Sequence, residues 1–335
     1  MKTLLIFLST LIFTFNSGPN PRTPSNGDTI IILNKSANTA WQLDAETGQK
    51  ITEYKTGVGP HEVAVSPDQE RAIITNYGDN APGNSLTIID LNAREISKTI
   101  SLGEFQRPHG VQWFSDGHRA IVTAESQQAV LIVDIDTGEI LSAIDTNQQT
   151  SHMVALSSNE KMAFVTNLGS GSLSILDLAA GKTVQTIKTG AGTEGVAVIP
   201  QSNRVWITNR SANTVSIFDP EANTVIATLK SSSFPIRAKA SPDGQLVAIS
   251  NARSSEVSIF EVETQEQLHK LSTVSGNRQG MPIGLTFSDD RSHLYIANSK
   301  ANHIAVISTK SWEIVNTFST GTTPDGIAYI SSKNN

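Results

Sequence analysis

The 335-residue sequence contains no cysteine. This absence excludes disulfides, thiolate metal sites, a cysteine nucleophile and a lipidated N-terminal cysteine. Aromatic residues make up only 6% of the chain and do not alternate with Lys or Arg, and the formal net charge is -6. Nucleic-acid binding is therefore not expected, because such surfaces combine excess positive charge with aromatic rings that stack on bases.

Long hydrophobic runs are also scarce. The clear example, Leu4 to Phe15, has 12 residues and is too short to span a bilayer comfortably. It follows the positively charged Lys2 and precedes small residues and a proline-rich stretch. This order predicts a signal peptide over residues 1–17 and a linker over residues 18–27. We expect export to the periplasm or cell surface, with no transmembrane domain after cleavage; retention of the leader as an N-terminal anchor is the alternative.

Familiar catalytic motifs are missing as well. The sequence has no G-x-S-x-G elbow, no H-E-x-x-H and no glycine-rich phosphate loop between a strand and a helix. No window shows a sustained apolar period of 3.6 residues, so helices are expected to be minor.

What the chain does contain is one pattern, repeated. Its first full copy, GPHEVAVSPDQERAIITN, begins at Gly59, and equivalent positions recur every 42 to 48 residues. Each unit holds four β-branched runs bounded by Gly, Pro, Asn, Asp or Ser, which is typical of a propeller blade. A half copy, Thr323 to Ser331, ends the pattern, and Asp28 to Asn34 supplies the missing strand. The sequence therefore predicts an all-β, seven-bladed β-propeller over residues 28–331. Its blades are four-stranded and antiparallel, and pairing of the terminal strands closes the ring.

The second apolar run of each unit ends in a short signature. Ile74 to Asn76, Val165 to Asn167 and Ile207 to Asn209 read Ile/Val-Thr-Asn, and Ser-Pro-Asp precedes the first of them. This pattern resembles the YVTN-type propeller repeat of exported bacterial and archaeal surface or periplasmic proteins. Related propellers include lactonase-type and streptogramin-lyase enzymes and the haem d1 domain of nitrite reductase. The resemblance therefore implies the fold and export but leaves the chemistry open. The recurrent Asn is expected to stabilise the turn that follows it.

One position per blade is expected to surround a channel mouth. It starts the innermost strand and is occupied in turn by His61, His109, His152, Glu194, Ile236, Ile283 and Asp325. Imidazole and carboxylate are suitable ligands for zinc or another divalent metal, so His61, His109, His152 and Glu194 form a candidate metal site. The alternative is a set of polar residues that face a water-filled channel.

Two further residues join these candidates. Arg237 adds a cation that either holds an anionic ligand or pairs with Asp325 or Glu194. In the second blade Ala124 replaces the recurrent Asn, and Glu125 beside it is a candidate second acid. The expected function is an exported binding protein that presents one loop face and its channel mouth to a partner protein or small ligand. A metal-assisted hydrolase or lyase using the histidines is the alternative, and a divalent metal is the one candidate cofactor.

Overall fold

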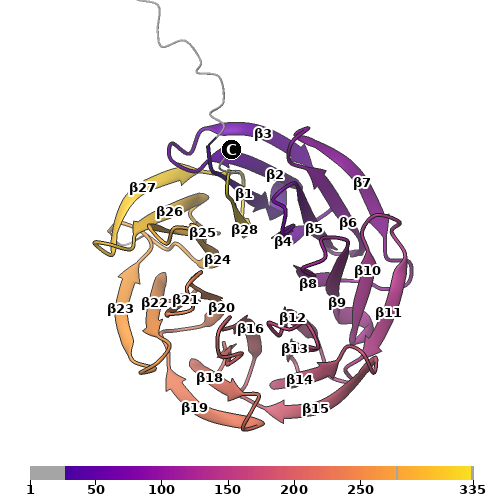
Figure 1. Cartoon of the computed structure of the whole chain (residues 1–335). Helices are drawn as coiled ribbons and strands as arrows, with labels where there is room; N and C mark the ends of the chain where they lie inside the picture. Colours follow the sequence, from indigo (N-terminus) through magenta and orange to yellow (C-terminus); the bar gives the residue numbers. More distant parts are fainter. Residues whose placement is uncertain (1–26, 277, 333–335) are drawn as a thin grey trace, which may run out of the picture.

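Seven four-stranded antiparallel sheets surround a central axis, as Figure 1 shows. The computed structural model describes residues 27–276 and 278–332. Within these residues the only helices are two short 3-10 segments, η1 (Lys35–Ala37) and η2 (Glu125–Gln127). The predicted seven-bladed all-β propeller is therefore confirmed.

Each blade is a meander that runs outward from the axis. Blades 1 to 3 comprise β4 (Pro60–Val65), β5 (Arg71–Gly78), β6 (Pro82–Asp90) and β7 (Glu95–Ser101); β8 (Pro108–Trp113), β9 (Arg119–Ala124), β10 (Ala129–Asp134) and β11 (Ile140–Asp145); and β12 (Ser151–Leu156), β13 (Met162–Asn167), β14 (Ser172–Asp177) and β15 (Lys182–Lys188). Blades 4 and 5 comprise β16 (Thr193–Val198), β17 (Val205–Asn209), β18 (Thr214–Asp219) and β19 (Thr224–Lys230); and β20 (Pro235–Ala240), β21 (Leu246–Asn251), β22 (Glu256–Glu261) and β23 (Gln267–Ser272). Blades 6 and 7 comprise β24 (Pro282–Phe287), β25 (His293–Asn298), β26 (His303–Ser308) and β27 (Glu313–Ser319); and β28 (Pro324–Ile330), β1 (Thr29–Asn34), β2 (Thr39–Asp44) and β3 (Lys50–Lys55).

Blade 7 joins the two ends of the described chain. Strand β28 pairs antiparallel with β1, with Thr29 opposite Ile330 and Ile32 opposite Ile327. This pairing removes an open sheet edge from the ring, as the split repeat predicted. The predicted signal peptide and nearly all of the linker lie outside the described residues.

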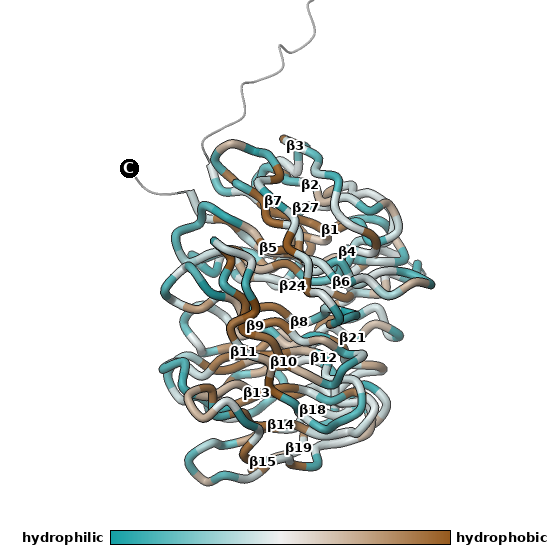
Figure 2. Tube along the Cα trace, turned by 90° about the vertical axis from the view of Figure 1, so that its right-hand side faces the viewer, coloured by the Kyte–Doolittle hydropathy of each residue, from teal (hydrophilic) through white to brown (hydrophobic). Residues whose placement is uncertain are grey.

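The core lies between blades rather than within one central mass. Seven clusters of buried hydrophobic residues each draw on two adjacent blades, including the pair formed by blades 7 and 1. The middle strands are buried on both faces, whereas outer strands such as β15 alternate between exposed and half-buried residues. The hydrophobic residues accordingly follow strands such as β9 and β10, and the hydrophilic residues gather in the loops (Figure 2).

The Asn at the end of the second strand is a structural residue. The Asn76 amide donates to the hydroxyls of Ser85 and Thr87 on β6 and accepts from the backbone N–H of Gly57 in the loop before β4. Asn209 bonds Thr214 and Ser216 in the same way. The prediction that Asn stabilises this turn is confirmed, and its bonds also link the turn to the neighbouring loop.

Among the residues that the structure describes, no helix has the length and hydrophobicity needed to cross a lipid bilayer.

Candidate functional site

A bulge in each innermost strand directs side chains toward the axis. In β8 the pairing with β9 shifts between Pro108 and Val111, which releases His109 and Gly110 from the ladder. The Thr123 hydroxyl of β9 accepts the freed N–H of Gly110 at 2.8 Å and donates to the carbonyl oxygen of His152 on the next blade at 2.7 Å. The Thr of the repeated signature therefore positions the candidate residues of two blades.

Three histidine rings lie against one another, with interplanar angles of 49° between His61 and His109 and 36° between His109 and His152. The ring centroids of His61 and His109 are 4.1 Å apart, and those of His109 and His152 are 3.7 Å apart. Tyr77, from the extended β5–β6 hairpin, sets its ring edge-on to His61 and His109. His109 has no exposed surface, and neither of its ring nitrogens has a hydrogen-bond partner among the described residues. Burial, with the charges of its neighbours, holds the pKa of His109 well below 6.5, so the ring is neutral.

His152 differs because it lies between two carboxylates. Its Nδ1 is 2.5 Å from Glu125 Oε1, and its Nε2 is 3.4 Å from Glu194 Oε1. Burial lowers the pKa of His152, but the bonds to these two carboxylates outweigh burial and raise it. The second Glu125 oxygen accepts a 2.6 Å hydrogen bond from the Tyr77 hydroxyl.

Two arginines hold the next carboxylate. Glu194 is 2.8 Å from an Arg210 nitrogen and 3.2 Å from an Arg237 nitrogen. Burial raises the pKa of Glu194, but His152 and the arginines outweigh it and lower the pKa to about 2. Arg237 also bonds Glu62 across the channel, from blade 5 to blade 1. The predicted pairing of Arg237 with Glu194 is therefore present, and Glu62 is a second partner that the sequence analysis missed.

Asp325 completes the ring on blade 7. Its carboxylate lies 3.2 Å from His61 Nδ1 and 3.5 Å from Lys35 Nζ. Burial raises the pKa of Asp325 to about 6, although Lys35 opposes the shift. Burial and the charges of Lys35 and Arg237 keep the pKa of His61 well below 6.5.

The predicted residues therefore converge, but into a buried layer. His109, His152, Glu194, Arg237 and Asp325 are all less than 8% exposed. We call His61, His109, His152, Glu194 and Asp325 the histidine layer. All of these residues except the half-buried His61 are buried, which differs from the open mouth that the sequence led us to expect. Each bulge turns the side chains inward, so they meet and bury one another.

Two groups in and beside this layer have the composition of a metal site. His109, Glu125 and His152 bring one ligand atom each within 4.8 Å of one another, and so do His61, Glu62 and His109. Glu62 and Glu194 already pair with arginine. Glu125 pairs with no arginine or lysine among the described residues, which makes it the better candidate ligand.

The open space lies beyond the layer, toward the turns between the first and second strands. A central cavity of about 780 Å³ is lined by the innermost strands of all seven blades, with Glu62 and Arg237 in its wall. Val63, Val111 and Met153 are half-buried there and leave apolar surface facing the cavity. Lys239 also lines the cavity. Its side chain is exposed to solvent, but the protein atoms around it partly desolvate the ammonium group and lower its pKa. No described carboxylate lies within ion-pair distance of Lys239.

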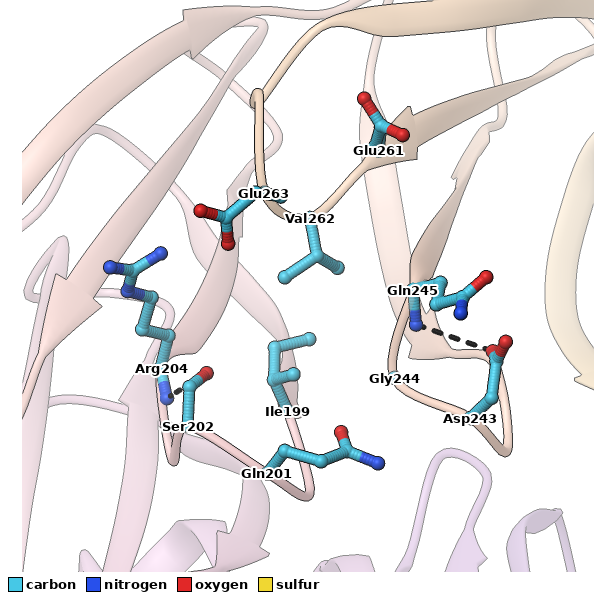
Figure 3. Close-up of a pocket in the computed structure, with 10 residues that line it drawn as sticks. All are labelled: Ile199, Gln201, Ser202, Arg204, Asp243, Gly244, Gln245, Glu261, Val262 and Glu263. Atoms are coloured by element: carbon cyan, nitrogen blue, oxygen red, sulfur yellow. Dashed lines mark hydrogen bonds between the residues drawn. The ribbon is translucent and has the colours of Figure 1, made fainter.

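A second pocket of about 570 Å³ lies between blades 4 and 5, at the turns between the first and second strands of both blades and the turn between β22 and β23 (Figure 3). Its charged groups come from separate turns, and several are already paired: Asp243 with Arg291, and Arg204 with Asp219. No group of candidate catalytic or metal-binding side chains converges there among the described residues.

Comparison with known proteins agrees with this fold. The uncharacterized protein YncE of Salmonella typhi and that of Salmonella typhimurium are each 28% identical over 152 residues, 44% of this chain and 41% of theirs. The match thus spans about two fifths of the length of these relatives. The chain also resembles the solved structures of hydrazine synthase from Kuenenia stuttgartiensis (TM-score 0.73, 20% identity, 88% of this chain and 99% of that chain) and of a functionally unknown protein from Desulfotomaculum acetoxidans (TM-score 0.76, 14% identity, 91% and 99%). At these identities the structural matches show the fold alone.

A family model supplies the assignment. The model described as the cytochrome D1 heme domain matches residues 115–328, which is more than half of the chain. These findings confirm the propeller but not specifically the YVTN-type repeat, which stays a resemblance. The chain belongs to the cytochrome D1 heme domain family.

Proposed function

We propose that the protein is an exported binding protein that takes a small organic anion into its central cavity. The observation that carries this proposal is Lys239, a cation in the cavity wall that forms no ion pair with a described carboxylate, although Glu62 and Asp289 of the same wall attract it from farther away. Lys239 is exposed to solvent, so its ammonium group is free to pair with an anionic ligand that enters the cavity.

The walls indicate what the rest of the ligand is like. Val63, Val111 and Met153 leave apolar surface facing a cavity of about 780 Å³, a size typical of sites for small molecules. Glu62 pairs with Arg237, whereas Lys239 forms no ion pair with a described residue, although Asp289 lines the same cavity. A monocarboxylate with an apolar body matches both features, because its chain covers apolar surface while its charge pairs with Lys239.

The family name raises the question of haem, and the donors of this cavity do not fit one. Haem iron is held by histidine, cysteine, methionine or tyrosine side chains. The histidines lie in the histidine layer, where the rings of His61 and His152 both contact the ring of His109. The cavity wall instead offers Met153, whose side chain packs against the core between blades 3 and 4, and Tyr329, whose hydroxyl already donates to Asp28. We therefore assign no haem chemistry to this chain.

The buried layer also weighs against the metal-assisted hydrolase or lyase that the histidines suggested. A catalytic metal needs an open coordination position that substrate can reach. His109 has no exposed surface, and Tyr77 covers it on the side of the loops. A binding role in the open cavity requires no such access to the layer.

Calorimetric titration with octanoate tests the proposal. Octanoate is expected to bind with one site per chain, whereas inorganic phosphate and uncharged octanol each bind at least about tenfold more weakly, because each lacks one of the two features. Equal affinity for octanoate and octanol would contradict the contribution of Lys239. The absence of octanoate binding would contradict the proposed ligand class.

Export is the second part of this proposal. It is supported by the apolar run Leu4 to Phe15 and by the resemblance to YVTN-type repeats. Cell fractionation and N-terminal sequencing of the native chain are expected to place the protein outside the cytoplasm. Full-length protein that begins at Met1 in the soluble cytosol would contradict export.

A further inference from the structure

The most unusual group in the described part of the molecule is His109. It is completely buried, and neither Nδ1 nor Nε2 finds a hydrogen-bond partner. Buried polar atoms without partners are rare in folded proteins, and each costs free energy. A neutral imidazole always has one nitrogen with a free lone pair, and that lone pair can bind a metal ion.

The neighbours of His109 supply the other ligands. The His152 ring lies against it at an interplanar angle of 36°, with ring centroids 3.7 Å apart, and Glu125 bonds His152 at 2.5 Å. One ligand atom from each of these three residues lies within 4.8 Å of the other two. Ligand atoms around a tetrahedral zinc ion are about 3.4 Å apart, given metal–nitrogen distances near 2.1 Å. Binding an ion therefore requires side-chain rotations that bring the more distant ligand atoms together by up to about 1.4 Å and open the 2.5 Å contact between Glu125 and His152 to about 3.4 Å.

A second shell for such an ion is already in place. The Tyr77 hydroxyl donates to the Glu125 oxygen that does not contact His152. Hydrogen bonds of this kind orient a carboxylate for coordination. Glu194, by contrast, is held by Arg210 and Arg237 and is less suited to bind a cation.

We infer that His109, His152 and Glu125 bind one divalent metal ion of the zinc type and that this ion ties blade 2 to blade 3. Two imidazoles and one carboxylate favour zinc or cobalt over the harder calcium and magnesium. The site is enclosed, so the ion has a structural role at the closed end of the channel. The inference does not depend on ligand binding in the central cavity, because it rests on other residues.

The test is a titration of the chelator-treated full chain with zinc and with cobalt(II). Wild-type protein is expected to bind one equivalent of either ion, to give the visible absorption of low-coordinate cobalt(II), and to keep the ion in excess magnesium. The variants Glu125→Gln and His109→Ala are expected to bind at least about tenfold more weakly, and Tyr77→Phe about tenfold more weakly. Thermal melting of each metal-free variant checks that it is folded.

Three matched variants locate the ion. His118→Ala removes an exposed histidine that contacts Asp136, and Asp325→Asn changes a carboxylate of the layer that is not a proposed ligand. His61→Ala removes one ligand from the other candidate metal group, which comprises His61, Glu62 and His109. All three are expected to keep the wild-type affinity within about twofold. Absence of stoichiometric binding by the wild type would overturn the inference. A loss of binding in His61→Ala without a loss in Glu125→Gln would also overturn it, because the ion would then lie in the other group.

Discussion

The Thr123 hydroxyl donates a 2.7 Å hydrogen bond to the backbone carbonyl of His152 on the adjacent blade. It also accepts the N–H of Gly110 in the bulge of its own blade. The same connection between adjacent blades recurs from Thr75 to His109, from Thr166 to Glu194, from Thr208 to Ile236 and from Ser250 to Ile283. In blades 1 to 5, one hydroxyl thus satisfies two backbone groups that the bulges leave out of the ladders, whereas Ala297 and Leu33 occupy the equivalent position in blades 6 and 7.

Replacement of Thr123 by Val tests this connection. Val retains the shape of Thr but leaves the Gly110 N–H and the His152 carbonyl without their partner. Each buried group that loses its bond costs about 1–3 kcal/mol, so we expect the free energy of unfolding to fall by at least about 2 kcal/mol. Urea denaturation measures the change. The exposed Thr228 provides the control, because Thr228→Val is expected to shift stability by less than about 0.5 kcal/mol. Equal effects of the two substitutions would contradict the connection.

Gly110 is required by the close approach of two backbones. A methyl group added at Gly110 would lie 2.8 Å from the Met153 Cα and 2.9 Å from the His152 carbonyl oxygen. Backbone atoms of an inner strand cannot move aside easily, so Gly110→Ala is expected to lower the free energy of unfolding by about 1–3 kcal/mol or more. Gly103→Asn is the control, because Gly103 has open space around it and Asn tolerates its left-handed backbone. Wild-type stability of Gly110→Ala would show that the blades have room to separate.

The fold was predictable because the repeat constrains it in many places at once. Each unit carries the same turn residues and the same four apolar runs, and the half copies at the two ends define the closure. The convergence of His61, His109 and His152 follows from equivalent positions in a closed ring. The burial of these histidines does not follow from their equivalent positions. It depends on side-chain length and on the hairpin that carries Tyr77, which is an insertion specific to blade 1.

Glu62 illustrates a signal that was present and overlooked. The residue after the candidate position is Gly in blades 2, 4, 6 and 7, where the backbone of the next blade leaves no room for a side chain. Blades 1, 3 and 5 carry Glu62, Met153 and Arg237 at that position. The opposite charges of Glu62 and Arg237 suggest a bond across the channel, and the structure contains one. The cation Lys239 was not found because one lysine in a strand says nothing about enclosure.

Asp325 makes the stability of the protein depend on pH in a defined direction. Burial raises its pKa to about 6, above the unfolded value of about 3.9. The native state therefore favours the protonated carboxyl, and this contribution to stability is present below pH 4 and lost as the pH rises through 6. The loss amounts to about 3 kcal/mol for a shift of this size. Asp325→Asn cannot ionise, so its stability relative to wild type is expected to increase between pH 4 and pH 7. A difference that stays constant over this range would show that Asp325 does not titrate as stated.

Lys239 provides the most direct test of the proposed binding function. In the substitution Lys239→Met the side chain keeps a similar length and loses its charge, so the cavity keeps its apolar wall. Lys230→Met makes the same change at an exposed residue at the end of β19 and serves as the control. Calorimetric titration with octanoate is expected to show at least about tenfold weaker binding for Lys239→Met, because an ion pair in an enclosed site is lost, and unchanged binding for Lys230→Met. Wild-type affinity in Lys239→Met would contradict the claim that this cation holds the ligand in the central cavity.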